Sequence, residues 1–371
     1  MVVLLKVTSA VLGASTMVVA TPSIRDTYRE LAEKLADVVP EPELAIKAEL
    51  AHEINQLKRE RQAVILGHNY MEPALYHSVC DYTGDSLELS RIAATVERDP
   101  IVFCGVRFMA ETAKILNPNR TVLLPARRAG CSLAASITAA DVRELRRQFP
   151  GVPVVSYVNT YADVKAESDI CCTSGNATMV VESLDAETVI FLPDEYLASN
   201  VAAETSKQIL FPTVHPVSRD KQRAGAQDDL HYEMIGWHGR CEVHEKFTVE
   251  DIQDVRAQFP DVVVLAHPEC SPEVVKASDF SGSTGAMTRY VSDTDAPRYL
   301  LLTECSMGDN IAAEVHDKEM VRLCTVRCPH MNEITLEEVL ASLREDRYHV
   351  EVDSSISHRA RNAIERMLEI S

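Results

Sequence analysis

The segment Val262-Val263-Val264-Leu265-Ala266-His267-Pro268-Glu269 is an apolar run that ends in a polar cluster. It indicates the fold because it has two counterparts earlier in the chain: Val64-Ile65-Leu66 runs into Gly67-His68-Asn69-Tyr70, and Val154-Val155 runs into Ser156-Tyr157-Val158-Asn159. A second apolar run follows each one, at 101–103, 189–192 and 299–302. Short apolar runs without alternation are typical of parallel strands covered on both faces, in layers where strands and helices alternate. The repetition predicts three similar α/β units that build one central site by pseudo-threefold symmetry.

Each unit also carries a turn rich in Ser, Thr and Gly where a helix should begin. These turns are Gly84-Asp85-Ser86, Thr173-Ser174-Gly175-Asn176 and Gly282-Ser283-Thr284-Gly285. Asp85 and Glu88 are spaced as a capping box. The exposed N–H groups of a helix N-terminus favour anions, although a single turn of this kind is more often only a cap. Three in register indicate a set of anion contacts.

Polar residues at the carboxyl ends of parallel strands are where ligands bind in open α/β sheets. Aligning the three units gives one row of His68, Tyr157 and His267, and a second row of Tyr70, Asn159 and Glu269. Such a set offers acid/base groups without a serine nucleophile.

One cysteine per unit stands in a polar, helix-breaking context, and these are Cys131, Cys241 and Cys328. The chain has 10 cysteines and no C-x-x-C pair, which fits a reduced interior better than a disulfide framework. Three thiolates without a fourth would leave one iron of a [4Fe–4S] cluster open as a Lewis acid. Two alternatives remain at this level: zinc held by His238, Cys241 and His244, and a purely structural role for the thiols.

Composition limits the possible partners. The formal net charge is −19, which argues against nucleic-acid or membrane binding and is typical of proteins that work in high salt. The chain lacks the P-loop, the G-x-S-x-G elbow and a G-x-G-x-x-G after a strand. Residues 1–20 are apolar, but the thin positive charge favours a disordered or misassigned extension, with a start at Met17, over an export signal. We expect a cytoplasmic protein.

Helical periodicity at both ends frames the repeated units. Apolar spacing predicts helices over 24–38 and 44–62, separated by Pro40 and Pro42, and two more over 333–344 and 356–370. The expected division is an N-terminal extension with a helix (1–44), three αβ units (45–135, 136–245 and 246–332) and C-terminal helices (333–371).

Several strings together resemble one family, the quinolinate synthases. They are Gly-Val-Arg-Phe-Met-Ala-Glu-Thr-Ala-Lys-Ile-Leu-Asn-Pro (105–118), Tyr-Val-Asn-Thr (157–160), Ser-Asp-Ile-Cys-Cys-Thr-Ser (168–174), Cys-Glu-Val-His-Glu (241–245) and His-Pro-Glu-Cys (267–270). The resemblance covers residue 45 to the end of the sequence. It implies three homologous three-layer αβα domains around a pseudo-threefold axis. It also implies one [4Fe–4S] cluster per subunit, held by Cys131, Cys241 and Cys328.

The implied reaction condenses iminosuccinate with dihydroxyacetone phosphate to give quinolinate, phosphate and two waters, in NAD biosynthesis. An aspartate oxidase or dehydrogenase could hand over the iminosuccinate. By resemblance Glu269 is the general acid/base, and Tyr70, His68 and His267 transfer protons and orient the triose. Contacts to substrate carboxylates or phosphate are implied for Tyr157, Asn159, Ser174, Ser283 and Thr284, with Ser86, Met109 and His244 lining the cavity.

Two departures from the family pattern bear on the site. The usual Ala-His-x-Tyr is here Gly67-His68-Asn69-Tyr70, with Met71 where glutamine is common, and Cys324 lies four residues before Cys328. The Cys-x-x-Met context favours Cys328 as the ligand. Competing hypotheses are a zinc lyase or hydrolase and a non-catalytic iron–sulfur regulator.

Overall fold

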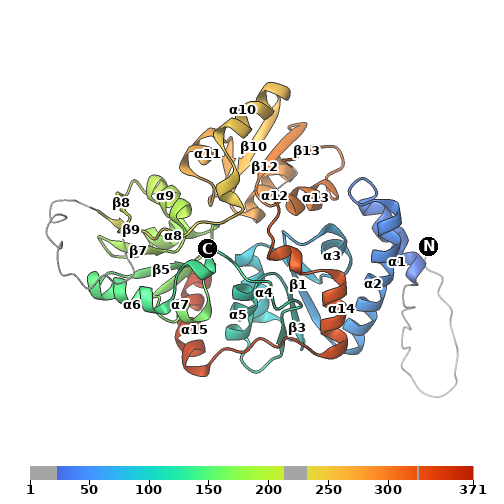
Figure 1. Cartoon of the computed structure of the whole chain (residues 1–371), viewed down its shortest axis with the longest axis horizontal. Helices are drawn as coiled ribbons and strands as arrows, with labels where there is room; N and C mark the ends of the chain where they lie inside the picture. The colour runs from blue at the N-terminus through green and yellow to red at the C-terminus, as the bar shows by residue number, and fades with distance from the viewer. Residues whose placement is uncertain (1–22, 213–231, 324–325, 371) are drawn as a thin grey trace, which may run out of the picture.

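The computed structural model describes residues 23–212, 232–323 and 326–370. It contains three separate parallel sheets, one in each of three domains (Figure 1). Domain 1 has the order β2-β1-β3-β4, domain 3 has β11-β10-β12-β13, and domain 2 has β6-β5-β7-β9-β8. The first three strands of each domain therefore follow the same order, and domain 2 differs because its fifth strand, β9, lies between β7 and β8. The predictions for residues 1–20 and for Cys324 concern parts of the chain outside the described residues.

The described strands include the six apolar runs of the repeated pattern, together with shorter strands that the pattern did not predict. They are β1 (Val64–His68), β2 (Tyr82–Gly84), β3 (Ile101–Cys104), β4 (Val122–Leu123), β5 (Val154–Tyr157), β6 (Ile170–Cys172), β7 (Val189–Leu192), β8 (Ile209–Leu210), β9 (Met234–Ile235), β10 (Val262–Ala266), β11 (Phe280–Ser281), β12 (Arg298–Leu302) and β13 (Glu319–Val321). Every residue of β1, β3, β5 and β7 is buried, because helices cover both faces of each sheet. The predicted α/β fold of three αβα domains is confirmed.

Each domain repeats the same helices around its sheet. One precedes the first strand: α2 (Glu41–Glu60), α6 (Ala139–Gln148) and α10 (Val249–Gln258). The others follow the strands: α3 (Pro73–Ser78), α4 (Ser86–Thr95), α5 (Arg107–Leu116), α7 (Ala162–Lys165), α8 (Ala177–Glu182), α9 (Glu195–Glu204), α11 (Pro272–Ala277), α12 (Thr284–Asp293) and α13 (Cys305–Ala312).

The helix-start turns behave differently in the three domains. Asp85 and Glu88 form the predicted capping box on α4, and the Ser283 side chain caps α12. Asn176 precedes α8 but makes no capping bond from its side chain. It is held differently, since its amide donates to the carbonyls of Met367 and Ile370.

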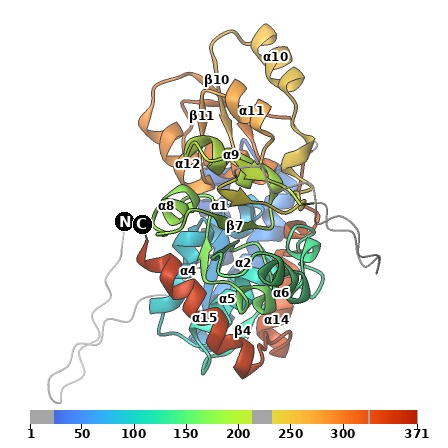
Figure 2. The ribbon, with the colours of Figure 1, turned by 90° about the vertical axis from the view of Figure 1, so that its left-hand side faces the viewer.

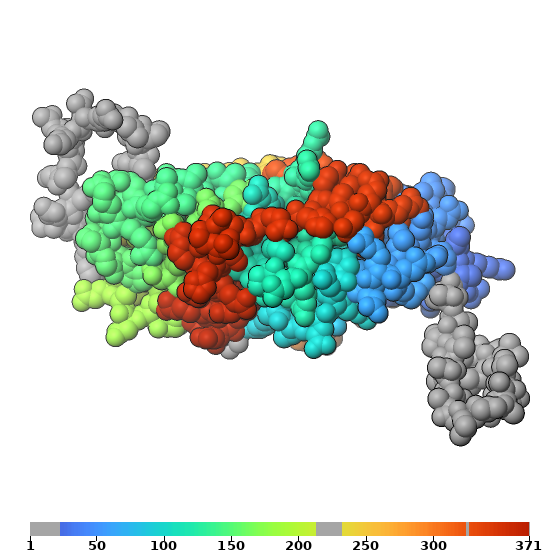
Figure 3. Space-filling view, turned by 90° about the horizontal axis from the view of Figure 1, so that it is seen from below, coloured from blue at the N-terminus to red at the C-terminus, as the bar shows by residue number. Residues whose placement is uncertain are grey.

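The terminal helices are α1 (Ile24–Leu35), α14 (Leu336–Glu345) and α15 (Ser354–Glu369). The second predicted helix starts earlier than expected, at Glu41, because Pro42 is tolerated in the first turn. α14 packs on α2, whereas α15 packs on α5 of domain 1 and on α7 and β6 of domain 2. Figure 3 shows this C-terminal segment lying across the junction of those two domains, and Figure 2 shows α15 running past α4 and α5. Among the described helices, none is both long and apolar enough to cross a membrane.

Candidate active site

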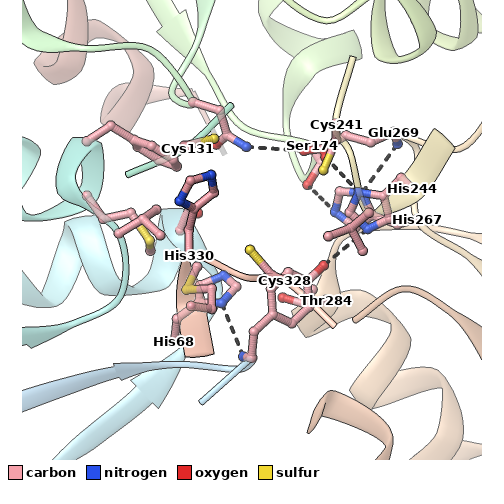
Figure 4. Close-up of a pocket in the computed structure, with 18 of the residues that line it drawn as sticks. His68, Cys131, Ser174, Cys241, His244, His267, Glu269, Thr284, Cys328 and His330 are labelled. Carbon is pink, nitrogen blue, oxygen red and sulfur yellow. Dashed lines mark hydrogen bonds and ion pairs between the residues drawn. The ribbon is translucent and has the colours of Figure 1, made fainter. Parts of the chain in front are cut away.

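A central cavity lies where the three domains meet, at the carboxyl ends of their strands (Figure 4). It is lined by nearly all of the predicted site residues: His68, Tyr70, Ser86, Met109, Cys131, Tyr157, Asn159, Ser174, Cys241, His244, His267, Glu269, Thr284 and Cys328. Ser283 is the exception, because its hydroxyl donates to Asp85 Oδ2 at 2.9 Å and it borders the neighbouring pocket instead. Both residue rows predicted from the sequence therefore meet in one place.

The three cysteines sit in loops of identical construction. Four residues after each one, a backbone N–H closes onto the cysteine's own carbonyl, at 3.0, 3.0 and 3.1 Å for Cys131, Cys241 and Cys328. A short 3-10 helix begins three residues after each: η1 (Ala134–Ser136), η2 (His244–Lys246) and η3 (Met331–Glu333). A threonine then caps the next long helix: Thr138 caps α6, Thr248 caps α10 and Thr335 caps α14.

A second repeated contact anchors each cysteine loop to its own domain. The first residue of the helix after the second long strand donates its backbone N–H to the carbonyl two residues before the cysteine. These bonds are Arg107 to Ala129 at 2.7 Å, Glu195 to Gly239 at 2.8 Å, and Cys305 to Val326 at 3.1 Å. The equivalence identifies Cys328 as the counterpart of Cys131 and Cys241.

The three thiols are neutral unless a cation is bound, and their surroundings would then stabilise the thiolates. Burial raises the pKa of Cys131 to about 12 and of Cys328 to about 11, and it raises the pKa of Cys241 well above its usual value. Backbone N–H groups of each following turn point at the sulfur, for example from Ala134 to Cys131 Sγ at 3.5 Å. Such N–H groups favour a thiolate once a positive metal balances its charge. The donor set therefore fits a metal group held by three thiolates.

Glu269 is the centre of the hydrogen-bond network. It is buried, and Nδ1 of His244 lies 2.7 Å from its Oε2. Its Oε1 accepts from the Tyr157 hydroxyl and from the Asn159 amide, the latter at 3.2 Å. Burial alone would raise the pKa of Glu269, but the contacts with His244, His267 and Tyr157 outweigh it and hold the pKa well below its usual value. The carboxylate is therefore ionised, with donors on both oxygens.

A chain of hydrogen bonds leads from this carboxylate to Tyr70. Nε2 of His244 lies 3.0 Å from Oγ1 of Thr303, and that oxygen lies 2.5 Å from the hydroxyl of Tyr70. Thr303 was missed in the sequence. It directly follows β12, so applying the strand-end argument to the second strand of each unit would have found it.

His68 and His267 share one local geometry. In each, Nδ1 accepts the backbone N–H two residues on, from Tyr70 at 3.2 Å and from Glu269 at 3.3 Å. Burial lowers the pKa of His68 to about 4 and that of His267 to about 3, so both are neutral at pH 7. With Nδ1 accepting, the proton is on Nε2. Nε2 of His267 donates to Ser174 at 3.2 Å, and its ring stacks on His244 with centroids 4.4 Å apart.

The predicted zinc set is not brought together. His238 is half-exposed, contacts Glu195 at 3.4 Å and does not line the cavity. The structure instead gathers Cys241, His244 and Glu269, whose possible ligand atoms all lie within 4.8 Å of one another. Since His244 and Glu269 already bond directly to each other, this group is satisfied without an ion.

The cavity contains no lysine or arginine among its described lining residues. Hydroxyls, amides, imidazoles and the carboxylates of Asp85, Glu242 and Glu269 provide its polar surface. Phe108, Val106 and Met331 add apolar walls that the sequence analysis did not single out. The site is thus a cavity with many hydrogen-bond donors, the ionised carboxylate of Glu269, two further carboxylates and three thiols.

Comparison with known proteins agrees with this fold and site. A family model described as quinolinate synthetase A protein matches residues 52–369. The quinolinate synthase of Agrobacterium fabrum is 52% identical over 340 residues, which cover 92% of this chain and 91% of the relative. Quinolinate synthase 2 of Mesorhizobium japonicum is 51% identical over 348 residues, covering 94% and 99%. The quinolinate synthase of Xylella fastidiosa strain Temecula1 is 53% identical over 317 residues, covering 85% and 86%.

These matches extend over most of the chain, and the range of the family model, 52–369, contains every cavity position described above. The chain belongs to the quinolinate synthase family, and it is an enzyme.

Proposed function

We propose that this enzyme makes quinolinate for NAD biosynthesis by condensing iminosuccinate with dihydroxyacetone phosphate, releasing phosphate and two waters. The observation that carries the proposal is the convergence of three equivalent cysteine loops and the Glu269 network on one cavity, in a chain of this family. The reaction needs repeated proton transfer and the departure of oxygen from carbon, and the Glu269 network and the three cysteines supply groups for these tasks.

The cysteines Cys131, Cys241 and Cys328 would hold a [4Fe–4S] cluster. Three equivalent loops and no fourth cysteine among the described lining residues support this assignment. When bound, such a cluster supplies a Lewis-acidic iron with a free coordination position. The backbone N–H groups aimed at the sulfurs would stabilise the thiolates and tune their charge.

Glu269 serves as the general base and then as the acid. As an ionised carboxylate it can accept a proton from substrate, while His244 and Tyr157 keep it oriented. The chain through His244 and Thr303 to Tyr70 gives that proton a route across the cavity. The hydroxyl of Tyr70 is then placed to deliver a proton to a departing oxygen.

The anionic groups of the substrates would be held by neutral donors. His68 and His267 carry their protons on Nε2, while Asn159, Ser86, Ser174 and Thr284 offer amide and hydroxyl groups. At buried positions such as His68, His267 and Thr284, oriented neutral donors stabilise negative charge strongly. This arrangement lets a protein with a net charge of −19 bind two anions without a lysine or arginine at the described cavity wall.

The decisive experiment is anaerobic purification, with iron and sulfide analysis coupled to a quinolinate assay on the two substrates. We expect a brown protein with about four irons per chain that forms quinolinate. A colourless zinc protein would favour the lyase or hydrolase alternative, and a brown protein without turnover would favour the regulator. Supplying iminosuccinate from aspartate with an aspartate oxidase or dehydrogenase tests the proposed hand-over in the same assay.

A further inference from the structure

Two buried asparagines make the same unusual contact on two of the catalytic strand ends. The amide of Asn310 donates to the carbonyls of Asn69 and Met71, at 3.1 and 2.9 Å, which flank Tyr70. The amide of Asn200 donates to the carbonyls of Pro268 and Cys270, at 2.8 and 3.0 Å, which flank Glu269. In each case one amide donates to the carbonyls before and after a residue of the second row (Tyr70, Asn159 and Glu269).

The two asparagines occupy equivalent positions on equivalent helices. Asn310 is the sixth residue of α13 and Asn200 is the sixth residue of α9. Both contacts cross a domain boundary, since domain 3 grips Tyr70 of domain 1 and domain 2 grips Glu269 of domain 3. The pseudo-threefold symmetry therefore calls for a third contact, from α5 of domain 1 onto Asn159 of domain 2.

The equivalent position on α5 does not make this contact, and a lysine on another helix makes it instead. The sixth residue of α5 is Thr112, whose hydroxyl bonds within its own helix to Phe108. In its place Lys165, on α7 of domain 2, donates Nζ to the carbonyls of Val158, at 2.7 Å, and Thr160. These carbonyls flank Asn159 just as the others flank Tyr70 and Glu269.

Lys165 is an exceptional residue to find in this role. It is fully buried, its Nζ lies 5.5 Å from the ring centroid of Phe108, and it makes no ion pair with any carboxylate among the described residues. Glu111, the nearest candidate on α5, already accepts from Arg107 and from the Ala162 backbone. Burying a lysine without a carboxylate is costly, so its two carbonyl contacts must be what holds it there.

We infer that Asn200, Asn310 and Lys165 are positioning residues that set the directions of Glu269, Tyr70 and Asn159 towards the cavity. A donor fixed to the carbonyls before and after a residue restricts backbone rotation at that residue. Misplacement of a catalytic group by about 1 Å can cost about a hundredfold in rate. The inference rests on the proposed function for its kinetic consequences, but the geometry alone predicts its structural ones.

The test measures amide hydrogen exchange and turnover on the cluster-loaded enzyme. Asn200→Ala should speed exchange across 267–271, Asn310→Ala across 68–72, and Lys165→Met across 157–161. Each should lower kcat by tenfold to a hundredfold with a smaller change in KM and with unchanged iron content. Asn200→Asp and Asn310→Asp keep the shape but turn carboxylate oxygens towards the carbonyls, and they should lower kcat at least as much.

Asn117→Ala is the matched control. Asn117 is also buried and also spans two carbonyls, those of Ala93 and Ala113 at 2.6 and 3.0 Å, but neither carbonyl is next to a residue that lines the cavity. Its loss should lower the melting temperature and leave kcat intact. Where Asn200→Ala does not fold, Asn200→Ser, which retains one donor, takes its place.

The inference is overturned when the Asn200, Asn310 and Lys165 variants behave like Asn117→Ala, with lower stability but unchanged kcat and no local rise in exchange. Hydrogen exchange decides the point even for an enzyme that forms no quinolinate. In that event the proposed function fails, while a local rise in exchange at the three strand ends still supports the positioning role.

Discussion

The cysteine loops and the strand ends of this protein lie in the same three domains but repeat to different degrees. The three loops share a carbonyl closure, a 3-10 turn, a threonine cap and a backbone anchor, and each presents the same side chain. The three strand ends share only their backbone course. They present histidine and tyrosine in one row, and tyrosine, asparagine and glutamate in the other.

The difference shows that the threefold symmetry is kept in the cysteine loops and is given up at the strand ends. A group held by three donors is served by identical loops, whereas a reaction with distinct proton donors and acceptors needs a different residue at each position. Even the buried support differs, as asparagine in two domains and lysine in the third. Experiments can therefore ask whether the loops are truly interchangeable and the strand ends truly not.

Replacing a cysteine should have the largest effect. Cys131→Ser, Cys241→Ser and Cys328→Ser should each lose the iron–sulfur absorbance and all measurable quinolinate formation, because each removes one of the three proposed ligands. Cys324→Ser is the matched control and should keep both. Iron and sulfide analysis of the four variants measures this directly. A cluster retained in Cys328→Ser but lost in Cys324→Ser would contradict the equivalence of the loops.

Glu269→Gln should come next, with kcat lowered about a thousandfold and iron content unchanged. The amide keeps the shape and can still bond Tyr157 or His244, but it cannot accept a proton, and general base catalysis contributes about 10²–10⁴-fold. Steady-state kinetics beside iron analysis tests this. Turnover near the wild-type rate would show that another group is the base.

Thr303→Val should lower kcat about tenfold to a hundredfold. It removes the hydroxyl that joins His244 to Tyr70 and leaves the volume nearly unchanged. Thr112→Val is a useful control, because Thr112 is equally buried but its hydroxyl bonds within its own helix to the carbonyl of Phe108 rather than to the relay. An equal loss of kcat in both variants would argue against a proton route through Thr303.

Acid should lower the free energy of unfolding because it protonates the buried histidines His68 and His267. The folded-state pKa values of His68 and His267, about 4 and about 3, lie below the unfolded value of about 6.5, so the unfolded chain binds more protons in between. Stability is therefore complete above pH 6.5 and is lost as the pH falls towards 4. At pH 5 each imidazole should contribute on the order of 2 kcal/mol of this loss.

Urea unfolding between pH 8 and pH 5 checks this prediction. His267→Gln should flatten the acid limb, whereas Tyr157→Phe should not, because burial raises the pKa of the equivalent tyrosine well above 10 and it does not titrate there. An acid limb that is the same in both variants would assign the effect to other groups.

The smallest effect is expected at the third helix-start turn. Thr284 lines the cavity, while Ser283 spends its hydroxyl on Asp85 and on the cap of α12. Ser283→Ala should therefore cost about 1 kcal/mol of stability with little change in KM. Thr284→Val should raise KM severalfold. A larger rise in KM for Ser283→Ala than for Thr284→Val would indicate that the Ser283 hydroxyl contacts substrate after all.

Much of this site could be predicted because its residues follow a simple local pattern. An apolar run ending in His-x-Glu or His-x-Tyr places those side chains at a strand end whatever the rest of the chain does. Thr303 directly follows β12 and could have been found in the same way, but Asn200 and Asn310 could not. Their roles depend on which domain faces which, and that is a matter of packing between segments far apart in the sequence. Lys165 could not be found either, since an isolated lysine is ordinarily a surface residue.

The fold, too, was predicted where it depends on local sequence pattern and not where it depends on distant packing. The central strands were predicted nearly to the residue, because continuous burial leaves an unambiguous apolar signature. Shorter strands such as β8 and β9, with two residues each, were not predicted, and neither were the sites on which α14 and α15 pack. Amphipathic spacing identifies a helix and its buried face, but it does not name the surface that the face covers.

The C-terminal helix also bears on the order in which the molecule can be assembled. α15 links domains 1 and 2 through arginines that donate to backbone carbonyls: Arg361 to Leu116 at 3.5 Å in domain 1, and Arg366 to Asp169 at 2.7 Å in domain 2. Domains generally fold as they leave the ribosome, the N-terminal ones first. A chain that has folded its first two domains already presents Cys131 and Cys241, but it has neither Cys328 nor this helix. The cavity is thus completed only late in synthesis, and a cell that loads a metal group into it must do so on a nearly finished chain.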